Sequence, residues 1–304
     1  MFSFDHLPSP CLMGIVNVTP DSFSDGGKFF DPHAAAAHAR ELWSHGAGIV
    51  DFGAEASSFF RAGVESIPAV EQLRRLVPVL EEISADVLRP IISVDTRSAE
   101  VAEEVLARGV WIINDISAGT HEPDILKVIA KAQRSNGAGV ILMHMGSEFP
   151  ATPPADDTDI VGTVRAYLGT RIQAAMEAGI SADRIAIDPG VGFGKTMADN
   201  WRLALRAVEV RPAGFAGPIV LGASRKRFLE TKPPSDVVLP DSWPGMPAGE
   251  HSRDAASAAV TAVALSCGVE IHRVHNLRSA DLRYFRRPEI LARWFGRTPY
   301  RGQV

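Results

Sequence analysis

The fold is decided by residues 184–195, which read Arg-Ile-Ala-Ile-Asp-Pro-Gly-Val-Gly-Phe-Gly-Lys. The apolar run from Ile185 to Ile187 is typical of a buried strand, and Asp188 is the first polar residue after it. Pro189 ends the strand because it has no N–H to donate, and the three glycines that follow at alternate positions allow tight turns. A carboxylate at the end of a buried strand, before a glycine-rich loop, is how an α/β barrel presents a binding or reactive group. The alternative is an Asp that caps its strand before an ordinary turn.

The same succession of a short apolar run and a longer amphipathic segment occurs eight times along the chain. The predicted strands are Leu12–Val18, Ile49–Gly53, Ile91–Asp95, Val110–Asp115, Gly139–His144, Arg184–Asp188, Pro218–Gly222 and Glu270–His275. The predicted helices lie at roughly 33–46, 66–85, 98–108, 123–136, 158–179, 199–211, 251–267 and 277–294. Eight such units in 304 residues favour a (β/α)8 TIM barrel over a doubly wound sheet. We therefore predict one α/β domain that spans residues 1–304.

Composition excludes several classes of protein. The net charge is −5, from 31 basic and 36 acidic residues, and no basic run is present, which argues against a nucleic-acid partner. Cys11 and Cys267 lie far apart without metal-type spacing, so we expect two reduced thiols. The first residues lack the pattern of a signal peptide, and no apolar run reaches membrane-spanning length. The sequence thus predicts a cytoplasmic protein with no membrane association.

Polar residues stand at or just beyond the end of every predicted strand. In chain order they are Asn17, Asp51, Glu55, Asp95, Asn114, Asp115, His144, Asp188, Ser224, Arg225, Lys226, Arg273 and His275. A capping role explains any one of them, but not a set that covers all eight strands. In a barrel, the carboxyl ends of the strands meet on one face, where active sites are built. The sequence therefore predicts a functional site in one cavity on that face.

The members of this set indicate the chemistry of the ligand. Four of them mix hydrogen-bond donors and acceptors, namely Asp95, Asn114, Asp188 and Lys226, which suits a flat heterocycle with several N–H and C=O groups. A cationic set is formed by Arg61, Arg273 and His275, and barrels commonly bind phosphate near strands 7 and 8. We predict a heterocycle at the base of the cavity and a phosphate or pyrophosphate at its rim. Residues 224–226 also fit a basic helix start, and His144 also fits a hydrogen-bonded core histidine.

Three predicted loops are longer than a barrel requires: 19–32, 54–65 and 231–250. The first two follow the first two strands, so they lie over the active-site face and are candidate lids. The third is rich in Pro and Gly, and we expect it on the surface and poorly ordered.

Seven motifs at the strand ends carry a family resemblance. They are Met13–Gly27 (MGIVNVTPDSFSDGG), Ser93–Thr96 (SVDT), Ile112–Asp115 (IIND), Leu142–Met145 (LMHM), Asp188–Lys195 (DPGVGFGK), Ser224–Lys226 (SRK) and Arg273–His275 (RVH). In this order they resemble dihydropteroate synthase, a pterin-binding barrel enzyme of the folate pathway, over nearly the whole chain. The resemblance implies condensation of dihydropterin-methyl pyrophosphate with p-aminobenzoate, with release of pyrophosphate and with Mg²⁺ as cofactor. It also implies a homodimer.

The resemblance assigns roles by position. The pterin ring would be held by Asp95, Asn114, Asp188 and Lys226, with Met143 and Phe193 packed near it. The pyrophosphate would be held by Arg61, Arg273 and His275, and Mg²⁺ by Asn17. Ser57 and Val274 also belong to the residues expected to bind the pterin diphosphate. Ser224 would lie near the p-aminobenzoate carboxylate. The residues expected to act in catalysis are Asp95, Asp188, Lys226, Arg273 and His275, with no nucleophilic side chain, because the amine of p-aminobenzoate attacks the methylene carbon itself.

The segment after the second strand departs from the family pattern Asp-x-Gly-Gly-Glu-Ser-Thr-Arg-Pro-Gly. Glu55 and Arg61 are six positions apart instead of three, so the loop has gained three residues. Ser57 or Ser58 takes the place of the Thr, and Phe59 and Phe60 are added in the p-aminobenzoate region. One interpretation is a harmless surface insertion. The other is a bulky loop that admits p-aminobenzoate and clashes with the extra ring of a sulfonamide, which predicts a sulfonamide-insensitive enzyme.

Two other functions stay open at this point. A catalytically silent relative would bind pterins without turnover because the altered loop no longer closes. A methyltransferase barrel that moves a methyl group from a methyl-folate to a corrinoid protein shares the ring-binding residues. It has no need for the Ser-Arg-Lys and Arg-Val-His motifs as a paired anion site, and both are present here.

The loop hypothesis makes a direct prediction. Deletion of Ser58-Phe59-Phe60 restores the family spacing and should markedly lower the inhibition constant of sulfonamides, measured in a turnover assay. An unchanged constant would show that the insertion has no part in drug selectivity.

Overall fold

The computed structural model describes residues 2–19, 31–55, 67–86, 91–146, 159–237 and 252–277. Its eight strands form one parallel sheet in the order β6-β5-β4-β3-β2-β1-β8-β7. The sheet closes between β6 and β7, because Ile187 pairs with Ile219 and donates its N–H to the carbonyl of Pro218 at 3.0 Å. The strands are β1 (Cys11–Asn17), β2 (Ile49–Gly53), β3 (Ile91–Asp95), β4 (Ile112–Asp115), β5 (Gly139–Met143), β6 (Ile185–Asp188), β7 (Val220–Leu221) and β8 (Ile271–Val274). The predicted (β/α)8 barrel is confirmed.

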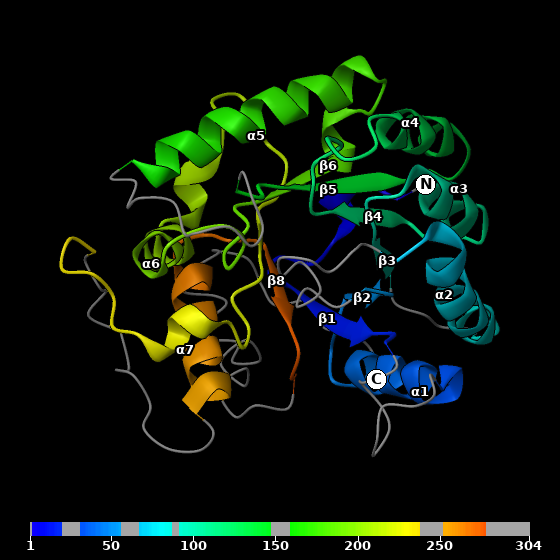
Figure 1. Cartoon of the computed structure of the whole chain (residues 1–304), viewed down its shortest axis with the longest axis horizontal. Helices are drawn as coiled ribbons and strands as arrows, with labels where there is room; N and C mark the ends of the chain where they lie inside the picture. The colour runs from blue at the N-terminus through cyan, green and yellow to red at the C-terminus, as the bar shows by residue number, and fades with distance from the viewer. Residues whose placement is uncertain are drawn as a thin grey trace.

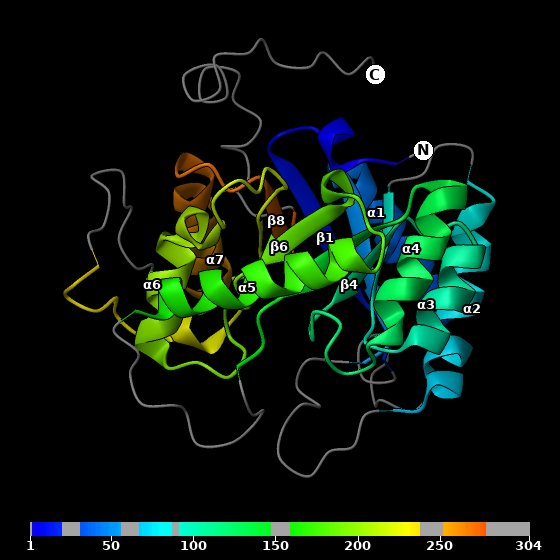
Figure 2. The same ribbon diagram turned by 90° about the horizontal axis from the view of Figure 1, so that it is seen from above.

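A helix follows each of the first seven strands and covers the outside of the barrel (Figure 1). The helices are α1 (Pro32–Ser44), α2 (Ala69–Ser84), α3 (Ala99–Ala107), α4 (Asp124–Asn136), α5 (Ile160–Glu177), α6 (Met197–Leu205) and α7 (Ser252–Ser266). Figure 2 shows α2, α3 and α4 side by side along one flank and α6 and α7 on the opposite flank. Each lies close to its predicted range. The helix predicted at 277–294 lies, except for Leu277, outside the described residues.

Local sequence sets where several helices begin and end. Asp31 accepts a hydrogen bond from His33 N at 2.9 Å, and Pro32 opens α1 where its missing N–H is harmless. Thr196 caps α6 by accepting from Asp199 N at 3.1 Å. Gly137 ends α4 at φ 85°, a left-handed conformation that glycine adopts without strain. Because Thr196 caps α6, this helix begins directly after the glycine loop that follows β6.

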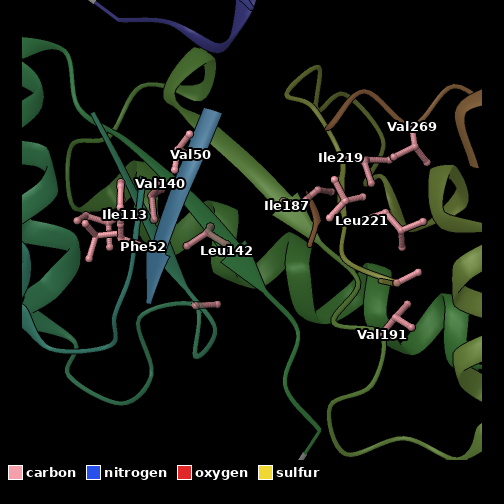
Figure 3. Packing of buried hydrophobic residues seen from close by; sticks show 14 of the residues in the cluster. Val50, Phe52, Ile113, Val140, Leu142, Ile187, Val191, Ile219, Leu221 and Val269 are labelled. Carbon is pink, nitrogen blue, oxygen red and sulfur yellow. The ribbon is translucent and has the colours of Figure 1, made fainter. Parts of the chain in front are cut away.

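Side chains alternate along each strand between the barrel interior and the helices. The outward set forms the large hydrophobic layer between sheet and helices (Figure 3), which includes Val50, Phe52, Ile113, Leu142 and Ile187. The inward set at the amino-terminal end of the strands forms a second, smaller cluster. It consists of Cys11, Met13, Ile49, Ile112, Ile141, Ala186, Val220 and Ile271, closed below by Phe2 and Phe4. This apolar plug seals the bottom of the barrel, so any cavity opens at the carboxyl end of the strands.

The segment predicted as a loose loop at 231–250 is packed at its beginning. Trp201 is fully buried and donates its indole N–H to Thr231 Oγ1 at 3.0 Å. Asp236 pairs with Arg202 at 2.9 Å, and Val237 is buried against the core. The expectation of disorder is therefore wrong for residues 231–237, and 238–250 lie outside the described residues. Within the described part of the chain, no helix has the length and apolar character needed to cross a bilayer.

The close approach of α1 to β1 yields a stability prediction. A Cβ at Gly14 would lie 2.9 Å from Leu42 Cδ1 and 3.1 Å from Leu42 Cβ, so Gly14→Ala should lower the free energy of unfolding by about 1–3 kcal/mol. Gly169 in α5 is the matched control, because its Cβ would make an ordinary 3.7 Å contact with Pro212. Gly169→Ala should raise the free energy of unfolding by about 0.5–1 kcal/mol. Urea denaturation measures both; an equal effect of the two changes would contradict the packing argument.

Candidate active site

Above the apolar plug, the next inward-facing level of the barrel is polar. Asp51 of β2 is fully buried there. Its Oδ2 accepts hydrogen bonds from Asn114 Nδ2 of β4 at 3.1 Å and from Arg273 Nε of β8 at 2.8 Å. Arg273 also donates to Asp95 Oδ2 of β3 at 3.2 Å. One network therefore joins β2, β3, β4 and β8 at the base of the cavity, and it brings together three of the predicted site residues.

The electrostatics of this network follow from one guanidinium beside two carboxylates. Burial raises the pKa of Asp95 to about 7; Arg273 opposes this shift and Asp51 adds to it. Burial works against the charge of Arg273, but Asp51 and Asp95 outweigh it and raise the pKa of the guanidinium. Arg273 therefore stays charged. For Asp95, burial favours the neutral carboxyl group and Arg273 favours the charged one.

The loop after β6 forms the opposite wall. Asp188 Oδ1 accepts from Gly190 N at 2.7 Å, and burial raises the pKa of its carboxyl group while Lys226 opposes the rise. Lys226 donates to the carbonyl of Val191 and lies 4.5 Å from the ring centroid of Phe193. Burial lowers the pKa of Lys226 to about 8, with Asp188 as the main opposing influence. A carboxylate, an ammonium group and an aromatic face are thus presented together.

Apolar contacts complete this wall. Phe193 and Met143 are both buried, and they form one small cluster with Ile116 at the carboxyl end of the strands. Met143 and Phe193 thus lie together, and their contact with the ligand stays a prediction. A buried apolar surface next to hydrogen-bonding groups is the usual lining of a site for a flat ring.

Two glycines lie on the inward face of the barrel beside these polar groups. A Cβ at Gly53 would lie 3.8 Å from both Asn17 Oδ1 and Asp95 Cβ. A Cβ at Gly222 would lie 3.8 Å from Arg273 Cβ and 3.9 Å from Lys226 Nζ. Both glycines continue the inward alternation of their strands, so neither places a side chain between the predicted metal ligand and the charged groups.

Ser224 and His275 form a separate pair beyond β7 and β8. Ser224 Oγ accepts from His275 N at 3.3 Å and lies 3.1 Å from His275 Nδ1. Burial, together with the neighbouring Arg273, Arg225 and Lys226, lowers the pKa of His275 to about 3. His275 is therefore neutral at physiological pH, which corrects its place in the predicted cationic set.

Several predicted groups point elsewhere. Asp115 turns into its own loop and accepts from Ser117 N at 2.8 Å and from Gly119 N at 2.6 Å. Arg225 pairs with Asp254 of α7 at 2.7 Å. The side chain of Val274 lies in the outer hydrophobic layer. His144 is buried and packs its ring edge-on against Tyr167, and burial lowers its pKa to about 3. His144 is thus a core histidine, as one interpretation of the sequence expected. Its Nδ1, however, has no hydrogen-bond partner in the described structure.

Part of the predicted site lies outside the described residues: Ser57, Phe59, Phe60 and Arg61. Sequence reasoning, in turn, placed Asp51 in the strand-end set without a ligand role and assigned no role to Lys195. Asp51 alternates with Ile49 and Gly53 on the inward face of β2. The alternation of side chains along the strand would have been enough to predict that it faces the barrel interior. Lys195 is buried, and its Nζ donates to the carbonyls of Gly190 at 2.7 Å and of His144 and Phe193 at 3.0 Å each. Burial lowers the pKa of Lys195 to about 7, with Lys226 as the next cause, whereas its three carbonyl acceptors favour the charged ammonium form.

The geometry agrees with comparisons to known proteins. A family model described as pterin binding enzyme matches residues 13–275, so the barrel and its polar level are those of a pterin-binding enzyme. The dihydropteroate synthase of Mycobacterium leprae (strain TN) is 37% identical over 273 residues, which cover 88% of this chain and 89% of that protein. This chain belongs to the dihydropteroate synthase family of transferases.

Further relatives support the same assignment. The mitochondrial folate synthesis bifunctional protein of Arabidopsis thaliana is 37% identical over 280 residues, and the match spans 47% of that protein. A solved Xanthomonas albilineans dihydropteroate synthase with 4-aminobenzoic acid has a TM-score of 0.72 and 37% identity, over 88% of each chain. The same enzyme in complex with 7,8-dihydropteroate has a TM-score of 0.72 and 35% identity, over 94% of each chain.

The glycine loop gives a test of the site's geometry. Gly190 has φ 68°, and a Cβ there would overlap the carbonyl oxygen of His144. Gly190→Ala should lower kcat/KM by about a hundredfold, because the wall that carries Asp188 and Phe193 must move. Gly214→Ala is the control, since φ is 80° there but nothing lies within 4 Å. It should cost only about 1–2 kcal/mol of stability and leave kcat/KM unchanged. Equal kinetics in both variants would refute the collision.

Proposed function

We propose that this protein condenses (7,8-dihydropterin-6-yl)methyl diphosphate with p-aminobenzoate, to give 7,8-dihydropteroate and pyrophosphate. The observation that carries the proposal is the polar level above the apolar plug, where Asp51, Asp95, Asn114 and Arg273 form one network opposite Asp188 and Lys226. These residues place hydrogen-bond donors and hydrogen-bond acceptors together in the buried interior of the barrel. A heterocycle with several N–H and C=O groups needs such matched partners once it is buried.

The reaction needs positioning and charge stabilisation rather than a side-chain nucleophile. The bond between the methylene carbon and the diphosphate oxygen breaks, and its electron pair leaves with pyrophosphate. The arylamine nitrogen forms the new C–N bond and loses a proton. Positive charge that grows on the pterin-methyl group is stabilised by carboxylates in a low-dielectric cavity. Asp188, fixed by Gly190 N, and Asp95, fixed by Arg273, are the carboxylates in place for this.

We assign the second substrate and the leaving group to the rim. Ser224, buried and bonded to His275, would lie near the carboxylate of p-aminobenzoate. Arg273 would attract the diphosphate, with neutral His275 and, by resemblance, Arg61 beside it. Arg273 has two carboxylate partners already, so a diphosphate would share it with Asp51 and Asp95.

We propose Mg²⁺ as the cofactor, held by Asn17. Within the described residues, no cluster of three or more His, Cys, Asp or Glu side chains is able to hold a metal. Asn17 Oδ1 instead faces the space above Gly53 as a single oxygen ligand. This donor set fits Mg²⁺, which usually takes one or two protein ligands together with substrate phosphates. Once bound, the ion would neutralise charge on the departing pyrophosphate.

Sulfonamide insensitivity is part of the proposal through the altered loop. Glu55 Oε1 accepts a hydrogen bond from Ile67 N at 3.0 Å, so the two ends of the segment 56–66 are tied together beside the cavity. Glu55 and Ile67 thus fix the distance that the lengthened segment has to span. The family resemblance further supports a homodimer and a cytoplasmic location as proposals.

The decisive experiment is pyrophosphate release from the pterin diphosphate, with and without p-aminobenzoate, in the presence of Mg²⁺. We expect release that depends on p-aminobenzoate. Asp188→Ala should abolish it with the fold intact, because the carboxylate is lost from the cavity. Asp188→Asn keeps an acceptor for Gly190 N and should retain the loop but lose most turnover. Circular dichroism controls for folding.

The other outcomes point to the other functions. Tight binding of the pterin diphosphate without pyrophosphate release would identify a silent pterin binder. Near-normal turnover of Asp188→Ala would remove Asp188 from the mechanism. Methyl transfer from a methyl-folate, without pyrophosphate release, would favour the corrinoid-linked methyltransferase.

A further inference from the structure

Lys195 is a buried charge that the reaction does not use. Its ammonium group has three N–H donors, and all three end on main-chain carbonyls, of His144, Gly190 and Phe193. In the described part of the chain it forms no ion pair with a carboxylate. An unpaired buried charge is unfavourable unless its hydrogen bonds are satisfied, and an apolar side chain often stabilises such a position as well. Stability alone therefore does not account for a lysine here.

The three carbonyls belong to two loops that meet without room for side chains. His144 begins the loop after β5, and Gly190 and Phe193 lie in the glycine loop after β6. A Cβ at Gly190 would overlap His144 O, and a Cβ at Gly194 would lie 2.9 Å from Gly146 Cα. The ammonium group lies at this junction and bonds to both loops at once.

Each carbonyl that Lys195 holds is adjacent to a working part of the site. Gly190 donates its N–H to Asp188 Oδ1 at 2.7 Å. His144 donates its N–H to the carbonyl of Asp188 at 3.0 Å. Phe193 carries the ring that lies under Lys226 and packs against Met143. A shift of the junction would therefore move the carboxylate and the aromatic wall together.

We propose that Lys195 is a positioning residue, which fixes Asp188 and Phe193 for the pterin substrate by clamping the two loops through their carbonyls. The inference rests on the proposed function for the identity of the substrate. Lys195 acts through the main chain and does not touch the substrate. The three carbonyl oxygens surround the ammonium group. The proposed positioning effect therefore requires a cation at this point, whether or not it is attached to the chain.

The first test compares Lys195→Met with the wild type. Methionine fills the space without donors, so the Kd of the pterin diphosphate, measured by calorimetry, should rise by about 10- to 100-fold. KM for this substrate should rise in parallel, with a smaller change in kcat. Lys127→Met is the control, because Lys127 is exposed on α4 and pairs only with Asp124. It should leave all three constants unchanged. An unchanged Kd in Lys195→Met overturns the proposal.

A double-mutant cycle tests the route of action. If Lys195 acts partly through Phe193, Lys195→Met should raise the Kd less in a Phe193→Ala background than in the wild type. Fully additive effects would overturn a route through Phe193. Wild-type pyrophosphate release is measured alongside, so that a failure of the proposed function is seen in the wild type and a failure of this inference only in the variants.

Chemical rescue separates positioning from simple packing. Lys195→Ala removes the atoms of propylammonium, so added propylammonium should restore pterin binding several-fold, whereas 1-propanol and tetramethylammonium should not. Equal rescue by 1-propanol would show that only volume is needed and would overturn the proposal. If Lys195→Met and Lys195→Ala both fail to fold, Lys195→Gln, which keeps two donors, is measured. A folded Lys195→Gln with wild-type binding, or a failure of all three to fold, assigns Lys195 to stability and likewise overturns it.

Discussion

The active-site end of this barrel depends on the placement of Arg273 between Asp51 and Asp95. A charge inside a barrel is strongly unfavourable unless it is paired and hydrogen-bonded. Here one guanidinium serves two carboxylates, and Asp51 also accepts from Asn114, so four strands share one electrostatic unit. Removal of Arg273 would leave two buried carboxylates without their cation. Burial raises the pKa of Asp95, and the neighbouring Asp51 adds to the rise while Arg273 opposes it.

This network divides the barrel interior into two levels with different tasks. Below it, inward side chains from seven strands form an apolar plug, against which Ile91 of β3 packs. The plug supplies stability and excludes water. Above it, Gly53 and Gly222 place no side chain among the polar groups. Opposite the network, the loop after β6 is gripped by two lysines, Lys226 through Val191 and Lys195 through three other carbonyls. The candidate site thus lies between the charged network of Asp51, Asn114 and Arg273 and the loop after β6, which Lys195 and Lys226 hold by hydrogen bonds.

The sequence predicted the architecture and most of the strand-end groups, because hydrophobic periodicity is local and each strand ends in a polar residue. It could not predict which groups meet. Asp51 and Arg273 are 222 positions apart in the chain. Their hydrogen bond forms because β8 pairs with β1, a long-range contact that local sequence patterns do not reveal. Arg225 pairs with Asp254 on α7, and burial, with the nearby Arg273, lowers the pKa of His275; both are effects of tertiary structure. In the sequence, Lys195 is only the last residue of a motif. Its contacts could not be predicted, because its three carbonyl partners come from two loops that meet only in the folded barrel.

The hydrogen bond between Glu55 and Ile67 has a consequence for how such enzymes diversify. It closes the segment 56–66 at its base, so the rest of the barrel is shielded from changes in the length of that segment. The entropy of closing a loop grows slowly, by about 0.6 kcal/mol for each doubling of its length. A change in the number of residues between Glu55 and Ile67 is therefore nearly neutral for folding. The barrel can accept such a change while the network of Asp51, Asn114 and Arg273 keeps its geometry.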